Sequence, residues 1–305
     1  MIWPLYSLIS SFSAALINFV DKYLIEKYAK QGNVGSLILF SSAVGIPASL
    51  IIWFFNRAVA NVSFFEALIL ILNGIMYTLW LIPYLYALKE DETSVVSPLF
   101  QISSIFTVIL GFIFLRESLN FVQTLGILSI MLGATGLTLE IKNIKSIKIK
   151  LRILGLMILS CSIIAVNTVI FKSIALETSF WSAVFWEYVG FSTAFVLFFS
   201  FIASFREDFL RMLRSNKVII ISLNVFNELL AMVSKLAFNA ALLLAPVGVV
   251  SFFSEGTQPV YVFFLGLLLT SLFPKIINES TEKKVIFQKF VSIIFIVVGS
   301  YLISL

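Results

Sequence analysis

Long apolar segments recur along almost the whole chain and constrain its fold more than any other feature. Each has about 20 mostly apolar residues, the length at which an α-helix crosses a lipid bilayer. With boundaries good to about three residues, the ten segments are residues 2–24, 35–56, 64–88, 93–115, 120–140, 152–173, 180–203, 217–243, 247–272 and 286–304. We therefore predict an all-α integral membrane protein with ten transmembrane helices.

The composition supports a lipid environment. The chain of 305 residues is 60% hydrophobic and only 12% charged, about half the charged share of soluble domains. A soluble globule of this size needs a polar shell, whereas a protein in lipid can turn apolar side chains outward. The connectors are too short to form a soluble domain. We expect a multi-pass protein of the plasma (inner) membrane, with the lipid bilayer as its surroundings.

Several classes of function are disfavoured by what the sequence lacks. The chain has no His and a single Cys, Cys161, so an ordinary Cys/His zinc site cannot be assembled, and we predict neither a metal site nor a cofactor. No GxxxxGK[ST] loop occurs, which argues against an ATP-driven pump. The net charge of +5 lies in short connectors between apolar segments, so we expect no nucleic-acid partner. An enzyme is not expected.

Basic residues are divided unevenly between the two sets of connectors. The connectors after segments 1, 3, 5, 7 and 9, with the adjoining segment ends, hold 17 Lys and Arg residues. The other set holds three, namely Arg57, Arg116 and Lys172. Because positive residues favour the cytoplasmic side, the first set should be cytoplasmic and both termini should lie outside.

The two halves of the chain resemble each other at a shift of 154 residues. Residues 87–98, ALKEDETSVVSP, then align with residues 241–252, ALLLAPVGVVSF, with five of twelve positions identical, and Asn73 aligns with Asn227. Five spans per repeat, an odd number, force opposite orientations in the membrane. Inverted repeats are typical of transporters, with the solute site near mid-membrane. The predicted units are repeat 1 (1–141), a basic connector (142–151) and repeat 2 (152–305).

One stretch of the first half is familiar. Residues 84–137 contain a helix ending in Ala-Leu, a second helix with the acidic end Arg116-Glu117, and a third with Gln123, Gly126 and Gly133. This pattern resembles the EamA repeat of the drug/metabolite transporter superfamily. The second half keeps the central proline as Pro259 but has Ser271 where the first has Glu117. The resemblance implies a ten-helix inverted-repeat carrier with a central cavity, similar to exporters of amino acids, drugs and other metabolites.

Three ionisable residues inside the predicted spans are the first candidates for a solute or ion site. Glu187, Lys235 and Glu255 lie about seven or eight residues from the same membrane side, so all three should be some 10–12 Å below one surface. Equal depth predicts one cluster, with the ammonium between two carboxylates. Such a cluster favours a cationic or zwitterionic solute, or lets one carboxylate exchange a proton. A buried ion network that only specifies packing is the alternative.

Further polar residues lie in the same spans. Glu228 is two turns deeper than Lys235, on a similar face of its helix. Gln101 aligns with Glu255 under the repeat, so the first half has a neutral group where the second has a charge. Lining of a site and hydrogen bonding between helices both remain open for these groups. The neutral candidates are Asn73, Asn227, Gln101 and Gln258.

Aromatic residues form a stripe on the third span. Tyr77, Trp80 and Tyr84 are three and four residues apart and share a helix face. Such a stripe serves packing or lipid contact more often than binding, but with Trp186 it would also wall a cavity around an amphipathic solute.

Other groups have simpler interpretations. Asp21, Lys22 and Lys172 lie near the ends of their spans, where snorkelling to the interface explains them. Small residues on span 5 (Gly126, Ser129, Gly133) and span 10 (Gly299, Ser300) predict close helix packing within the bundle, with a homodimer seam as the alternative.

These observations favour a secondary carrier that moves a small metabolite or drug-like solute by alternating access. The preferred solute is an amino acid or another zwitterionic or cationic metabolite, the preferred direction is export, and coupling to a proton or ion is left open. A flippase for lipid-linked substrates and a non-transporting membrane scaffold are the alternatives.

The topology can be tested by cysteine labelling. With Cys161 replaced by Ala and Ser146 by Cys, a membrane-impermeant thiol reagent should leave intact cells unlabelled and should label them after permeabilisation, because residue 146 lies in the most basic connector. Labelling of residue 146 in intact cells would show that the protein has the opposite orientation in the membrane.

Overall fold

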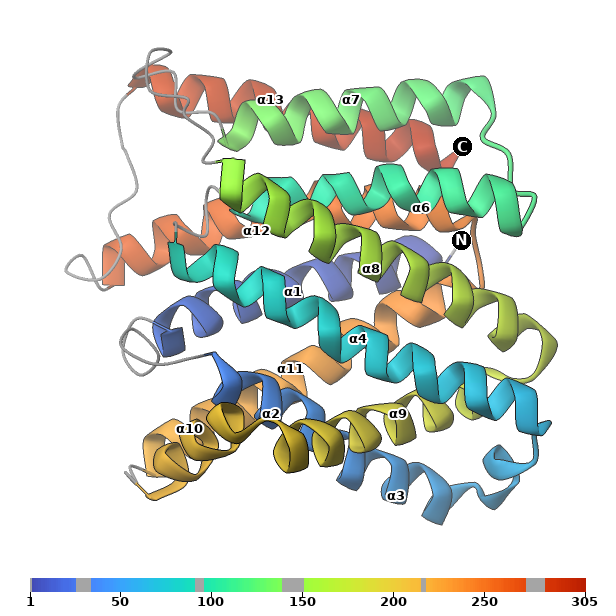
Figure 1. The fold of residues 1–305 in the computed structure, drawn as a ribbon. Coiled ribbons are helices and arrows are strands. Elements are labelled where there is room, and N and C mark those ends of the chain that lie inside the picture. The colour runs from blue at the N-terminus through green and yellow to red at the C-terminus, as the bar shows by residue number, and fades with distance from the viewer. Residues whose placement is uncertain (1, 26–33, 91–95, 139–150, 215–217, 273–282) are drawn as a thin grey trace.

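The computed structural model describes residues 2–25, 34–90, 96–138, 151–214, 218–272 and 283–305, and Figure 1 shows them as a bundle of helices. Within these ranges no β-strand is present. Short 3-10 turns occur at Arg57–Ala60 and Ser97–Phe100. The α-helices are α1 (Trp3–Leu24), α2 (Gly35–Ala43), α3 (Gly45–Phe55), α4 (Phe64–Glu90), α6 (Gln101–Phe114), α7 (Phe121–Thr138), α8 (Leu151–Glu177), α9 (Phe180–Phe201), α10 (Ala203–Arg214), α11 (Val218–Leu242), α12 (Val247–Leu272) and α13 (Lys283–Ser304).

Seven stretches of the described chain are long and apolar enough to cross a membrane. They are Trp3–Leu24, Gly35–Phe55, Phe64–Glu90, Leu151–Glu177, Phe180–Phe201, Ile221–Leu242 and Phe287–Ser304. The protein is therefore a multi-pass, all-α integral membrane protein, as predicted. The count of ten spans is not established by this criterion, because α6 and α7 are shorter apolar helices. Helix α12 is also not among the seven stretches. Its Glu255, Thr257 and Gln258 lie close together in the sequence and lower the mean hydropathy of the helix.

Helix α10 was not predicted. Its sequence, ASFREDFLRMLR, is too charged for a span, but its apolar residues recur with helical spacing. Phe205 and Met212 are buried, whereas Arg211 on the opposite side is exposed. The helix packs against α2 and α9 through this apolar face, which is how an amphipathic segment forms a helix where a connector was expected.

Both termini lie at the same end of the bundle, together with the connectors 56–63, 115–120 and 243–246 (Figure 1). Because both termini lie at one end, the chain must cross the membrane an even number of times, which agrees with the predicted topology. The assignment of this end to the outside stays a prediction, because the basic connector and Ser146 lie outside the described residues.

The helices pack in a few strongly contacting pairs. Helices α7 and α13 run side by side, α1 packs against α11 and α12, α4 against α8 and α9, and α6 against α8 and α12. The small residues predicted at close contacts lie between α7 and α13, where Gly126 abuts Gly299 and the Ser129 hydroxyl donates to the Phe295 carbonyl at 2.8 Å. These residues therefore serve packing within one chain, as predicted first.

A close backbone contact that bears on the interior joins α4 and α9. Gly74 and Gly190 face each other, so that a Cβ on Gly74 would meet the backbone of Glu187 and of Gly190. Without side chains at these positions the two backbones approach closely. This approach brings Asn73, the neighbour of Gly74, within hydrogen-bonding reach of Glu187.

This contact predicts opposite effects of one substitution at two glycines. Gly74→Ala should lower the free energy of unfolding by about 1–3 kcal/mol, because the new methyl group overlaps backbone that cannot rotate away. Gly155→Ala in α8 meets nothing within 4 Å and should stabilise the helix by up to about 1 kcal/mol. Thermal unfolding of the purified proteins in detergent measures both. Equal midpoints for the two variants would contradict the close approach of α4 and α9.

Candidate functional site

A cavity lies between the helices, and its mainly apolar wall carries several buried polar side chains. Its volume is about 190 Å³, far more than the ~15 Å³ that one water requires. Helices α1, α2, α4, α8, α9, α11 and α12 all contribute side chains to its wall. Lining residues on α11 recur every three or four positions, from Asn224 through Glu228, Met232 and Lys235 to Asn239. The polar residues of α11 thus lie mostly on the face turned to the cavity, which explains how so polar a helix is tolerated in a membrane.

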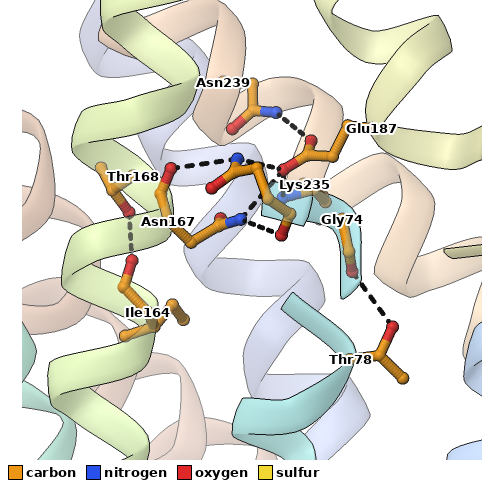
Figure 2. Close-up of polar contacts among 9 residues, drawn as sticks. Gly74, Thr78, Ile164, Asn167, Thr168, Glu187, Lys235 and Asn239 are labelled. Atoms are coloured by element: carbon orange, nitrogen blue, oxygen red, sulfur yellow. Dashed lines mark hydrogen bonds and ion pairs between the residues drawn. The ribbon is translucent and has the colours of Figure 1, made fainter. Parts of the chain in front are cut away.

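Glu187 on α9 is held in a cage of hydrogen-bond donors (Figure 2). Its Oε1 accepts hydrogen bonds from the side-chain amides of Asn73 at 3.0 Å and Asn167 at 3.1 Å, and lies 3.1 Å from the Lys235 ammonium. Its Oε2 accepts from Asn239 at 3.5 Å. The side chain is fully buried and does not line the cavity. Four donors from three other helices therefore compensate the cost of burying this carboxylate.

The two asparagines in the cage also join α4 to α8. The Asn73 amide donates to the Asn167 backbone carbonyl at 3.3 Å, and the Asn167 amide donates to the Asn73 carbonyl at 2.9 Å. Each side chain thus satisfies a backbone oxygen of the other helix and the Glu187 carboxylate at once. Such a closed network fixes the relative position of the helices.

Lys235 lines the cavity, but its charge is already matched. Besides the ion pair with Glu187, its Nζ lies 3.6 Å from the centroid of the Tyr77 ring and 5.8 Å from that of Phe191. Tyr77 and Phe191 are stacked with centroids 5.0 Å apart. The ammonium is thus neutralised by a carboxylate and an aromatic face.

Glu255 on α12 lies on the cavity wall away from this pair. Its carboxylate accepts hydrogen bonds from the hydroxyls of Ser103 at 2.7 Å and Ser104 at 2.5 Å, both on α6. Among the described carboxylates, Lys235 pairs within 4 Å with Glu187 alone. The predicted ammonium between two carboxylates is therefore wrong. Equal depth does not determine direction around a helix axis, and Glu255 faces α6.

Two more carboxylates line the cavity. Asp21 on α1 accepts from the Asn227 amide at 2.7 Å, and the Tyr84 hydroxyl lies 3.3 Å from its second oxygen. Glu228 on α11 accepts from the Ser41 hydroxyl at 2.6 Å. Both side chains are buried. The snorkelling interpretation of Asp21 is wrong, because its side of α1 packs on α11 and the asparagine and tyrosine compensate its desolvation.

Lys172 is also buried rather than snorkelling. Its ammonium forms an ion pair with Glu117 at 2.5 Å and donates to the Ala245 carbonyl at 2.7 Å. The other Glu117 oxygen accepts from the backbone N–H of Val247 at 2.6 Å, at the start of α12. Glu117 of the family-like motif thus ties α8 and the α11–α12 connector together at the end of the bundle that holds the termini.

The remaining candidates divide into two groups. Asn227, Gln258, Trp80 and Tyr84 line the cavity, as Lys235, Glu228 and Glu255 do. Asn73, Gln101 and Trp186 do not.

The sequence interpretation missed several lining residues, among them Asn18 and Asp21 on α1 and Asn167 on α8. Asn18 and Asp21 are three positions apart on one helix face, a polar spacing that marks them in an apolar segment. In the described part of the chain, no group of three or more His, Cys, Asp or Glu side chains is arranged to hold a metal ion.

These features define a class: a multi-pass α-helical membrane protein with a cavity between its helices that is lined in part by acidic side chains. Residues 1–139 match the family model described as the EamA-like transporter family. The predicted resemblance is thereby confirmed for this part of the chain, and the family is part of the drug/metabolite transporter superfamily.

The fold has solved counterparts. One, described only as the crystal structure of a protein, aligns with a TM-score of 0.64 and 13% identity, over 97% of this chain and 94% of that one. At this identity the likeness shows the fold alone. No curated protein matches the sequence significantly.

The Glu187 cage predicts how charge removal affects stability. Lys235→Met should cost about 3–5 kcal/mol, because it leaves the buried Glu187 carboxylate without its cation. Adding Glu187→Gln to this variant should restore most of the loss, since the amide no longer carries a charge. Thermal unfolding in detergent compares the two. A double variant no more stable than Lys235→Met would contradict the pairing.

Proposed function

We propose that this protein is a secondary carrier that moves a small cationic or zwitterionic metabolite through the central cavity by alternating access. The observation that carries the proposal is the cavity wall, in which Asp21, Glu228 and Glu255 stand beside aromatic rings in a multi-pass membrane protein. Ionisable groups at such depth are costly and usually serve the transported species. The family match at residues 1–139 supports the same class of function.

The pattern of helix contacts supports an inverted repeat. Under the proposed repeat, α1 corresponds to α8, α4 to α11, α6 to α12 and α7 to α13. The contact of α1 with α11 then corresponds to that of α8 with α4, and the contact of α1 with α12 to that of α8 with α6. The α6–α12 and α7–α13 contacts correspond to themselves. This exchange symmetry favours ten helices in two units, residues 1–141 and 152–305, joined by 142–151.

The two asparagines related by the repeat, Asn73 and Asn227, bind carboxylates with different roles. Asn73 donates to Glu187, whose charge is matched by Lys235, whereas Asn227 donates to Asp21, which lines the cavity. The first carboxylate serves the structure and the second faces the solute. We propose that rocking of the repeats exposes the cavity to each side in turn, in the direction of export from the cell.

Glu255 is our candidate for coupling to a proton or another ion. It joins α12 to α6 through the hydroxyls of Ser103 and Ser104, and these two helices correspond under the repeat. Its counterpart in the first half is the neutral Gln101. Only one of the two repeats therefore has an ionisable group at this interface. Binding of a proton or cation to that group can stabilise one arrangement of the repeats relative to the other.

Transport by purified protein in liposomes tests the proposal. Glu255→Gln should reduce uptake of radiolabelled amines and amino acids at least tenfold (~1.4 kcal/mol), or abolish its dependence on a pH gradient, while the protein still inserts. Glu177→Gln, at an exposed residue near the end of α8, is the matched control.

Full pH-dependent transport by the Glu255→Gln variant would reject the coupling role. Wild-type vesicles that translocate a fluorescent lipid but none of the soluble probes would favour a flippase, and vesicles that move neither would favour a scaffold.

A further inference from the structure

The geometry points to a specific solute class: we propose that Asp21, Glu228 and Asn227 form an ammonium-binding subsite beside an aromatic wall, and that the solute is an organic cation with an apolar ring rather than a zwitterion. This inference rests on the proposed function and narrows it. It follows from the charges, the unused hydrogen-bond acceptor and the rings that line one part of the cavity.

The two carboxyl groups of this subsite lack a basic partner in the part of the chain that the structure describes. Asp21 is held by the Asn227 amide and the Tyr84 hydroxyl, and Glu228 by the Ser41 hydroxyl. Among the described residues neither carboxylate has a Lys or Arg nitrogen within 4 Å. The two groups are linked through α11, because Asn227, which donates to Asp21 at 2.7 Å, directly precedes Glu228. Two carboxyl groups buried in one cavity are costly to ionise without a cation, so a cationic solute would stabilise their charged forms.

One unused hydrogen-bond acceptor lies next to Asp21. Asn227 donates to Asp21 through its amide nitrogen, while its Oδ1 is buried and accepts no hydrogen bond from a described residue. Asn227 is 6% exposed and lines the cavity. A buried acceptor without a donor is costly, and an ammonium group has three N–H donors. Asp21, Glu228 and the Asn227 oxygen together offer an acceptor for each of them.

An aromatic wall adjoins the carboxylates. Trp80, Tyr84 and Phe100 line the cavity with ring centroids 5.3–6.0 Å apart. Tyr84 belongs both to the aromatic wall and to the carboxylate subsite, since its hydroxyl lies 3.3 Å from the Asp21 carboxylate. The faces of these rings attract a cation and bury an apolar body, so the site fits an amine that carries a ring.

On the described cavity wall, no Lys or Arg is left to bind a carboxylate of the solute. Lys235 is the one described Lys or Arg that lines the cavity, and its ammonium is committed to Glu187 at 3.1 Å and to the Tyr77 ring at 3.6 Å. The carboxylate of a zwitterion would enter a cavity that already holds Asp21, Glu228 and Glu255. Repulsion therefore disfavours zwitterions and anions relative to cations.

Three probes that share a phenyl ring and a two-carbon linker test this selectivity. Phenethylamine is a cation, L-phenylalanine adds a carboxylate to it, and hydrocinnamate has the carboxylate alone. Calorimetric titration of the purified protein in lipid nanodiscs should show phenethylamine binding at least tenfold more tightly than phenylalanine, and no binding of hydrocinnamate. Equal or tighter binding of phenylalanine would overturn the proposal.

Substitutions at the subsite test whether phenethylamine binds there. Asp21→Asn and Glu228→Gln keep the shape of the side chains and should each weaken phenethylamine binding at least tenfold, whereas Glu177→Gln should not change it. Trp80→Leu should weaken phenethylamine binding at least fivefold and leave methylamine unaffected, which tests the aromatic wall even where a carboxylate variant fails to fold. Unchanged binding by folded Asp21→Asn protein would reject the assignment.

Binding and transport separate this inference from the proposed function. Selective binding of phenethylamine without its transport in liposomes would reject the carrier and leave the subsite intact. Transport of phenylalanine in preference to phenethylamine would support the carrier and reject the subsite.

Discussion

The ion pair of Glu187 and Lys235 is the interaction on which the interior depends. A carboxylate with no exposed surface is tolerated in a membrane protein only when several donors meet it. Here Asn73 comes from α4, Asn167 from α8, and Lys235 with Asn239 from α11. The network therefore holds four helices, α9 included, in one arrangement, and the closely packed Gly74 and Gly190 bring α4 and α9 near enough for it to form.

The same network determines the character of the cavity. Because Glu187 compensates the positive charge of Lys235, the remaining ionisable groups on the described wall of the cavity are the carboxyl groups of Asp21, Glu228 and Glu255, together with the tyrosines. A structural pair and an acidic cavity thus arise from one arrangement of α11, whose polar face runs from Asn224 to Asn239. The asymmetry between the matched and the unmatched carboxylates is the physical basis of the proposed preference for cations.

The sequence predicted how deep charged residues lie along their helices, but it did not predict in which direction around the helix axis their side chains point. Residues at equal distance from a helix end lie at equal depth, so Glu187 and Lys235 were correctly expected to meet. The same argument placed Glu255 with them, whereas its side of α12 faces Ser103 and Ser104 on α6. For Asp21 and Lys172, proximity to a helix end suggested snorkelling, but hydrogen-bonding partners on other helices made burial the more stable outcome.

The sequence by itself determined the membrane environment, the helical class and the approximate limits of the long apolar helices, because apolar length and backbone hydrogen bonding in lipid leave few alternatives. The family resemblance of the first part also followed from local motifs. The tertiary structure alone decided which polar residues meet, since contacts such as Asp21 with Asn227 join positions 206 residues apart. Helix rotation and partner choice depend on the packing of all the neighbouring helices together, and no local pattern specifies them.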